Sequence, residues 1–135
     1  MLEIKVASLS RFQKLTLAAR IVTLGAIAER KLDREPLPDL VVSWGSPRPT
    51  RGNERLSPHG LGRVVARVLG ERRRCVVQSL VLHRLLAAQG DRPELVVGIP
   101  GAAENHNAHA WVELDSVEVG PPPGSSGNLE MARFR

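Results

Sequence analysis

The order of the apolar patterns along the chain is the feature that most constrains its fold. Residues 10–31 carry apolar side chains at helical spacing, with Ser10 as a candidate N-cap. Residues 75–90, "CVVQSLVLHRLLAAQG", form a second strong helical pattern that ends at Gly90, a residue type that closes helices. Residues 94–119 instead contain short segments of strand type. Helices gathered before strands predict an α+β fold with an antiparallel sheet.

Turns and breakers divide the rest of the chain. Two prolines in "DREPLPDL" end the first helix, and residues 43–58, rich in Pro, Gly, Ser and Arg, predict an irregular connection. "PHGLGRVVARVLG" predicts a short helix that ends near Gly70. "AHAWVEL", "DS" and "VEV" predict a hairpin beside a buried strand at "ELVVGI". Residues 2–6 suit either a short strand or an unpaired tail, and "NLEMARFR" is a tail of uncertain structure.

Composition and charge bound the class of protein. The 135 residues, 42% of them hydrophobic, suit one domain with a mainly aliphatic core, because only 3% are aromatic. The net charge of +5 favours acidic partners, such as nucleic acid, an anionic surface or an acidic peptide. Arginine supplies all 19 basic residues except Lys5, Lys14 and Lys31, a usage that also follows from a GC-rich genome.

The compartment is inferred from cysteine usage and from hydropathy. A single cysteine forms no internal disulfide, so nothing points to an oxidising compartment. The first residues lack the pattern of a signal peptide, and the longest apolar run is too short to span a bilayer. We therefore expect a cytoplasmic protein that does not act at a membrane.

The single cysteine, Cys75, stands at the expected start of its helix. A thiol in that position lies beside free backbone N–H groups and the positive end of the helix dipole. Arg72, Arg73 and Arg74 add positive charge next to it. Both effects favour a reactive thiolate in general. Cys75 is therefore a candidate nucleophile, and the alternative is a small buried packing residue.

A histidine in the strand region is the candidate base. His109 lies within "AHAWVEL", and Trp111 shares its face because side chains alternate along a strand. An imidazole on a strand beside a helix that starts with cysteine is typical of thiol proteases and thiol acyltransferases. The alternative is an ordinary hydrogen-bonded histidine. His83 is expected on the polar side of its helix, and His59 and His106 in loop or helix-start positions.

The sequence gives little support for a metal site or a cofactor site. No two histidines have the spacing of a zinc site, and a second cysteine ligand is absent from the sequence. We therefore expect neither a metal ion nor a cofactor.

Three segments together resemble a known family. "CVVQSLVLHRLLAAQGD", "LVVGI" and "AHAWVELD" resemble the transglutaminase-like leader peptidases of lasso-peptide biosynthesis, in their stand-alone form. The likeness covers roughly residues 73–123 and is carried by Cys75, Ser79-Leu80, Leu85-Leu86, Gly90, Gly98 and the run from Ala108 to Glu113. It implies a papain-like, transglutaminase-type core, with N-terminal helices followed by a Cys-bearing helix packed on a small antiparallel sheet. It also implies one domain over 1–135, with a helical region (1–60), a catalytic core (61–123) and a tail (124–135).

The resemblance also implies an activity. Such a protein is a cysteine peptidase that removes the leader from a ribosomally made precursor, and a partner ATP-dependent cyclase then closes the lasso ring. Cys75 matches the family nucleophile and His109 the family base. The implied partners are the leader region of the precursor, a small leader-binding protein and the lasso cyclase, with no nucleic acid. Two other interpretations stay open: a transglutaminase-like acyltransferase that uses the same pair, and a non-catalytic basic module that binds nucleic acid or protein.

One position departs from the family pattern. The family often has an Asp that orients the imidazole, and Pro121 stands in its place here. Asp115 is the candidate third member, although a backbone carbonyl near Gly120 or Pro121, the side chain of Asn128 or a water are alternatives. Glu113 is separated from His109 by four residues along the strand, roughly 13 Å, which is too far for a hydrogen bond.

The remaining candidates concern binding. The backbone N–H of Cys75 is expected in the oxyanion hole, with Gln78 or Asn107 as the second donor. Trp111, Asn107 and Gln78 are the expected substrate-binding residues. The helix at 10–31 is the candidate docking element for the leader-binding protein, because it combines an apolar stripe with cations; the alternative is that it only covers the core.

Overall fold

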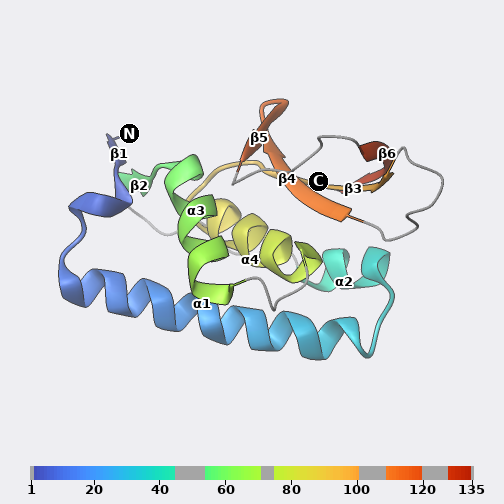
Figure 1. Ribbon diagram of the computed structural model, residues 1–135, viewed down its shortest axis with the longest axis horizontal. Helices are drawn as coiled ribbons and strands as arrows, with labels where there is room; N and C mark the ends of the chain where they lie inside the picture. The colour runs from blue at the N-terminus through green and yellow to red at the C-terminus, as the bar shows by residue number, and fades with distance from the viewer. Residues whose placement is uncertain (1, 45–53, 71–74, 101–108, 120–127, 135) are drawn as a thin grey trace.

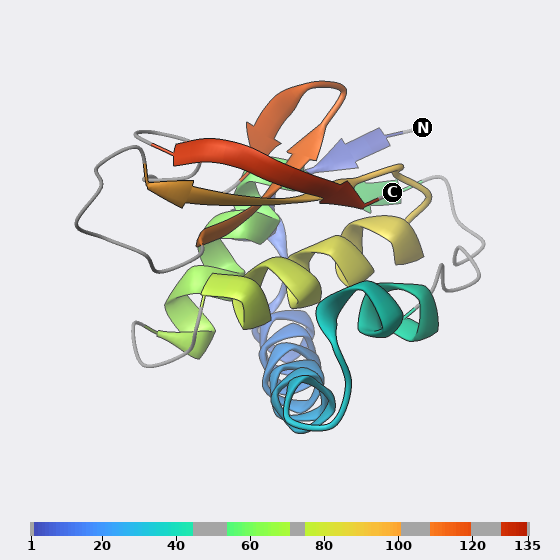
Figure 2. The same cartoon turned by 90° about the vertical axis from the view of Figure 1, so that its right-hand side faces the viewer.

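A computed structural model describes residues 2–44, 54–70, 75–100, 109–119 and 128–134. Figure 1 shows its elements, which are β1 (Leu2–Ile4), η1 (Val6–Ser8), α1 (Arg11–Leu32), α2 (Leu37–Trp44), β2 (Glu54–Leu56), α3 (Pro58–Leu69), α4 (Cys75–Ala88), β3 (Glu94–Pro100), β4 (His109–Leu114), β5 (Val117–Val119) and β6 (Asn128–Phe134). They stack in layers: the larger sheet lies above α4, α2 and α3 lie beside α4, and α1 lies below (Figures 1 and 2). The expected α+β architecture, with a Cys-bearing helix packed on a small antiparallel sheet, is confirmed.

Helix α1 begins where the sequence predicts. The N–H of Gln13 donates to the Ser10 hydroxyl (3.1 Å), and the N–H of Ser10 donates to the Gln13 side-chain oxygen (2.9 Å). This reciprocal pair is a capping box, which satisfies two donors that the first turn leaves unpaired. Ser10 is therefore confirmed as the N-cap.

The apolar side chains of α1 divide between two faces. Ile21 and Ala28 are buried against the core. Phe12 and Leu15 are instead 79% and 70% exposed, and Val22 is exposed with them. The spacing that predicted the helix thus includes an outward-facing apolar stripe as well as the buried face.

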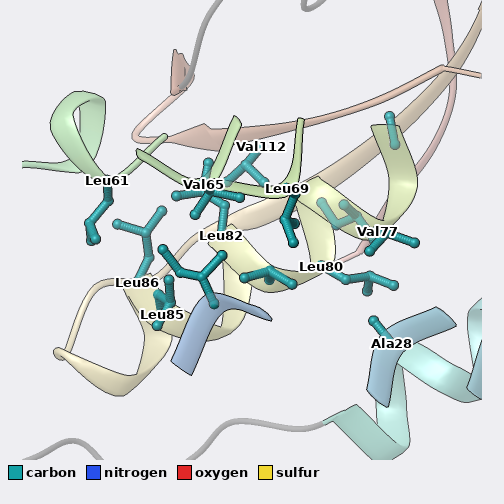
Figure 3. Packing of buried hydrophobic residues seen from close by; sticks show 14 of the residues in the cluster. Ala28, Leu61, Val65, Leu69, Val77, Leu80, Leu82, Leu85, Leu86 and Val112 are labelled. Atoms are coloured by element: carbon teal, nitrogen blue, oxygen red, sulfur yellow. The ribbon is translucent and has the colours of Figure 1, made fainter. Parts of the chain in front are cut away.

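Helix α4 is the centre of the molecule. Most of its side chains are buried, and they meet α1, α3, β3 and β4. Figure 3 shows Leu80, Leu82 and Leu86 of this helix packed among side chains of α3 and β4. A helix covered from all sides is apolar all round, and this explains why so much of the sequence from Cys75 to Ala88 is aliphatic.

The end of α4 follows from one glycine. Gly90 has φ 98°, a left-handed conformation that costs glycine little. The N–H of Asp91 donates to the Leu86 carbonyl (3.0 Å), and the N–H of Gly90 donates to the Ala87 carbonyl (3.1 Å). This is a Schellman motif, and it confirms the predicted helix end.

The larger sheet has the strand order β5-β4-β3-β6 and is antiparallel throughout. Its register pairs Val96 with Trp111 and Gly98 with His109. Asp115 and Ser116 close the β4–β5 hairpin with φ values of 52° and 66°, as a two-residue turn of primed type requires. The predicted hairpin and its "DS" turn are confirmed.

Successive side chains along each strand point to opposite faces of this sheet. Ala110 and Val112 join the hydrophobic core around α4, and Leu95 of the neighbouring strand joins it as well. Trp111 is also buried, but by alternation it lies on the opposite face of β4. His109 shares the face of Trp111.

Helix α2 lies where the sequence predicted only a break. Pro38 is its second residue, a position at which a missing N–H breaks no helical hydrogen bond. The indole N–H of Trp44 donates to the Leu80 carbonyl (3.0 Å), so α2 is anchored on α4. Two prolines therefore mark the start of a new helix, and they do not begin a long irregular segment.

Two strands were also missed. β2 forms within residues 43–58, expected to be irregular, and pairs in parallel with β1, so residues 2–4 form a strand and not a tail. β6 forms within the expected tail and pairs with β3. Residues 45–53 and 120–127 lie outside the described residues. Among the helices of the described residues, none is long and apolar enough to cross a membrane.

An arginine on β6 ties that strand to its neighbours. The Arg133 guanidinium bonds Glu94 of β3 (2.6 Å) and Glu113 of β4 (3.0 Å), and it also bonds Glu130 on its own strand. Hydrogen bonds to Glu130, Glu94 and Glu113 raise the pKa of Arg133. The guanidinium therefore connects strands β6, β3 and β4 across the outer face of the sheet.

We expect Leu86→Ala to lower the free energy of unfolding by about 2–5 kcal/mol, because the Leu86 side chain is fully buried and its loss leaves a cavity. Leu15→Ala is the matched control: it makes the same change in a helix, but at a side chain that is 70% exposed, and should cost under about 0.5 kcal/mol. Urea unfolding followed by circular dichroism measures both. Similar losses in the two variants would contradict the central position of α4.

Candidate active site

The single cysteine lies where α4 meets the sheet. Cys75 is the first residue of α4 and is half-buried. Its sulfur accepts a hydrogen bond from the backbone N–H of Ala110, at 3.4 Å. Ala110 follows His109 directly in β4. The Cys75 sulfur therefore contacts the backbone of the residue that follows His109.

The Ala110 N–H lies outside the described pairing of β4 with β5. Among the described residues, β5 pairs with β4 from Val112 to Leu114. The Ala110 N–H instead bonds the sulfur of Cys75 at the start of α4. The thiol thereby gives this backbone donor a hydrogen-bond partner.

The Cys75 sulfur lies beside backbone donors. The first N–H groups of a helix have no partner within it, and Cys75 is the first residue of α4. The Ala110 N–H adds a donor aimed at the sulfur itself.

The His109 side chain lies against Trp111. The ring centroids are 6.1 Å apart and the planes are tilted by 31°. His109 is half-buried, while Trp111 is only 6% exposed. Trp111, predicted to bind substrate, thus offers little free surface and instead supports the imidazole.

Glu113 fixes the indole of Trp111. The Trp111 Nε1–H donates to Glu113 Oε2 at 2.9 Å, and Arg133 bonds the other carboxylate oxygen at 3.0 Å. Burial acts to raise the pKa of Glu113, but the hydrogen bonds from Trp111 and Arg133 outweigh it and leave the pKa below its usual value. The carboxylate therefore stays charged near neutral pH, and a continuous chain of contacts runs from Arg133 to His109.

Asp115 is not brought to the imidazole. It is exposed and lies in the hairpin turn, at the opposite end of β4 from His109. Six residues of extended strand span about 20 Å. Pro121 and Gly120 lie outside the described residues, as does Asn107.

Gln78 has a structural partner. Its Nε2 donates to the Gly70 carbonyl at 2.8 Å, which joins the first turn of α4 to the end of α3. Asn128 is the first residue of β6, and its backbone pairs with Pro100. Among the described residues, no hydrogen bond joins the Gln78 side chain to the Cys75 sulfur.

His83 is buried, which corrects the expectation that it lies on a polar side of its helix. It is 7% exposed, because α4 has no solvent-facing side at this position. Burial lowers the pKa of His83, and a hydrogen bond to the Pro93 backbone acts in the opposite direction. Among the described residues, its Nε2 has no hydrogen-bond partner. His59 is exposed in the first turn of α3, as expected, and His106 lies outside the described residues.

Sequence reasoning missed the roles of Glu113 and Arg133. The i, i+2 spacing of Trp111 and Glu113 on a strand was a usable signal, because it places both on one face. Arg133 gave no such signal, since its part depends on the unpredicted strand β6. Within the described ranges, no three His, Cys, Asp or Glu side chains gather in a way that could hold a metal ion.

Comparison with known proteins agrees with this geometry. The model of the transglutaminase-like superfamily matches residues 13–131. None of the curated proteins and none of the solved structures matches the chain. A domain of this kind fits a cysteine peptidase or an acyltransferase. The core consists of a helix that begins with Cys75, packed on an antiparallel sheet in which one strand begins with His109. The chain thus belongs to the transglutaminase-like superfamily.

Proposed function

We propose that the protein is a cytoplasmic cysteine peptidase that removes the leader from a ribosomally made lasso-peptide precursor. One observation supports this chemistry: the Cys75 sulfur lies at a helix start and accepts a hydrogen bond from the backbone of Ala110, the residue after His109. The superfamily match over residues 13–131 supports the cysteine chemistry. The choice of substrate is supported by the motifs of residues 73–123, which resemble the leader peptidases.

The reaction uses the two residues in succession. In this reaction the His109 imidazole takes the proton of the Cys75 thiol, and the thiolate then attacks the scissile carbonyl. The backbone N–H of Cys75, at the start of α4, stabilises the oxyanion that forms. The imidazolium gives its proton to the departing amine, the new N-terminus of the core peptide. Water then hydrolyses the thioester and releases the leader with a free carboxylate.

Trp111 and Glu113 take the orienting role that the family gives to an Asp. Glu113 holds the indole through its Nε1–H, and the indole lies against the imidazole of His109. The indole limits the directions in which the imidazole can turn. Glu113 and Trp111 are positioning residues, because they act on the substrate only through His109.

The outer face of α1 is the proposed docking site for a small leader-binding protein. Phe12, Leu15 and Val22 form an exposed apolar stripe there, away from the buried face of the helix. A partner that holds the leader raises the concentration of precursor at the active site without new contacts to Cys75. The lasso cyclase would then consume the amine that cleavage frees.

We expect Cys75→Ala to abolish cleavage, because alanine cannot form the thioester, while leaving the fold intact at a half-buried helix start. The assay incubates the protein with the precursor encoded beside it, with and without the neighbouring leader-binding protein, and reads the products by mass spectrometry. A leader that ends in a free carboxylate indicates a peptidase, and a leader joined to an amine indicates the acyltransferase alternative. Turnover by the alanine variant would exclude Cys75 as nucleophile.

We expect His109→Ala to slow cleavage by about 10²–10⁴-fold, since the general base is lost. Alkylation of Cys75 by iodoacetamide should slow as well, which tests the pair without any substrate. His59→Ala is the matched control, because His59 is exposed on α3 and should leave both rates unchanged. Cleavage by the His109 variant within about tenfold of the native rate would contradict its role.

We expect Glu113→Leu to reduce cleavage and Glu113→Gln to restore most of it, because the amide oxygen still accepts from Trp111 Nε1–H. The glutamine variant should still lose stability at neutral pH, through the weakened contact with Arg133. Because the pKa of folded Glu113 is lowered, this contribution exists above the pKa of the unfolded chain and disappears as the pH falls through the folded value. Thermal melts and cleavage rates across a pH series measure both effects. Equal loss of cleavage activity in the two variants would show that Glu113 has only a structural role and does not position His109 through Trp111.

A further inference from the structure

A basic groove runs along α3, on the side where that helix meets the N-terminal half of α1. It has a volume of about 690 Å³. Cations from separate elements line it: Lys5 precedes η1, Lys14 lies on α1, and Arg63 and Arg67 lie on α3. The described lining residues include no Asp or Glu. The groove is therefore a site of concentrated positive charge.

The cations of the groove differ from Arg133 and Arg84, which have partners within the protein. Arg133 bonds several carboxylates, and Arg84 donates to the Trp44 carbonyl and lies 5.1 Å from the centre of its ring. Within the described residues, the groove's lysines and arginines make no ion pair and no side-chain hydrogen bond. Arg63 and Arg67 are one helical turn apart, so their like charges weaken α3. A bound anionic partner would remove this repulsion.

The floor of the groove is aliphatic. Val6, Leu17, Val64 and Val68 are half-buried and line it between the cations. No aromatic side chain is among the described lining residues, so nucleobases find no surface on which to stack. A basic rim around an aliphatic floor instead suits a peptide that carries both acidic and aliphatic side chains.

The length of the groove sets the length of such a peptide. Its lining residues on this side run from Ser57 to Val68, nearly the whole of α3. A helix of 12 residues is about 18 Å long, because each residue adds about 1.5 Å. An extended peptide adds about 3.3 Å per residue, so about five residues fill the groove.

The groove leads toward the nucleophile. Val68 lines its end, and α3 closes at Leu69. The next carbonyl, that of Gly70, accepts a hydrogen bond from Gln78 at 2.8 Å. Gln78 lies in the first turn of α4, the turn that begins with Cys75. A chain held in the groove therefore ends close to the helix start that carries the thiol.

We propose that this groove holds an acidic, extended stretch of the polypeptide substrate, about five residues long, and so directs a neighbouring peptide bond to Cys75. The proposal rests on the proposed function in one respect, that the substrate is a polypeptide. It identifies a contact remote from the cleaved bond, and it predicts that acidic and aliphatic side chains on the substrate carry that contact.

The test measures binding in the Cys75→Ala variant, which has no nucleophile. The probe is a fluorescein-labelled peptide of alternating glutamate and leucine, and anisotropy reports its affinity. We expect Arg63→Glu/Arg67→Glu to weaken binding by at least about tenfold, because like charges then face each other across the contact. Arg34→Glu/Arg92→Glu is the matched control: it makes the same charge change at exposed residues outside the groove and should alter affinity by less than about twofold. Added salt should weaken binding by the native groove.

Several results would overturn the proposal. Equal losses of peptide affinity in the groove and control variants would show that the peptide is attracted only by the net charge of the protein. Displacement of the peptide by single-stranded DNA, together with loss of DNA binding in the groove variant, would identify a nucleic-acid site instead. If the charge reversal prevents folding, Arg63→Gln/Arg67→Gln tests the same contact, and unchanged affinity there counts against it. Because the binding measurement needs no turnover, a failed cleavage assay would not affect its result. A failed binding measurement would likewise leave the cleavage assay valid.

Discussion

The burial of α4 on all sides is the interaction on which the rest of the structure depends. The sheet covers one side, α1 covers the opposite side, and α2 and α3 fill the flanks. Leu80 and Leu86 are almost fully buried in this packing. A helix held in this way cannot turn without moving close-packed side chains out of place. The position of Cys75, at the end of the same helix, is therefore fixed by packing that extends through the whole core.

The position of His109, the second candidate residue of the site, depends on the sheet. The antiparallel register sets His109 opposite Gly98 and Trp111 opposite Val96. Contacts across three strands then reach the imidazole, from Arg133 through Glu113 to the indole. The two candidate catalytic residues are thus positioned by different parts of the fold, and the hydrogen bond from the Ala110 N–H to the Cys75 sulfur links these parts.

Local signals in the sequence predicted the elements that local interactions determine. The start of α1 follows from Ser10 and Gln13, the end of α4 from Gly90, and the hairpin from the turn after Leu114. Contacts between distant residues determine what was missed. α2 depends on Trp44 meeting the Leu80 carbonyl, and β6 depends on pairing with β3.

The same division holds within the site. Alternation predicts that His109 and Trp111 share a face, and the helix pattern predicts Cys75 at a helix start. Neither pattern predicts that Arg133 reaches Glu113, because no turn signal reveals the register of β6. Helical spacing also failed to place His83, because only the surrounding layers decide whether a helix has a polar side.

The order of the layers along the chain has a consequence for synthesis. α1, α3 and α4 all leave the ribosome before β3 to β6, which cover the remaining side of α4. Until those strands arrive, the aliphatic surface of α4 that later meets Val112 stays in contact with water. Uncovered apolar surface of this kind makes partly folded chains prone to associate. The nascent chain is therefore most exposed to aggregation, and most dependent on chaperones, between the completion of its helices and the closure of its sheet.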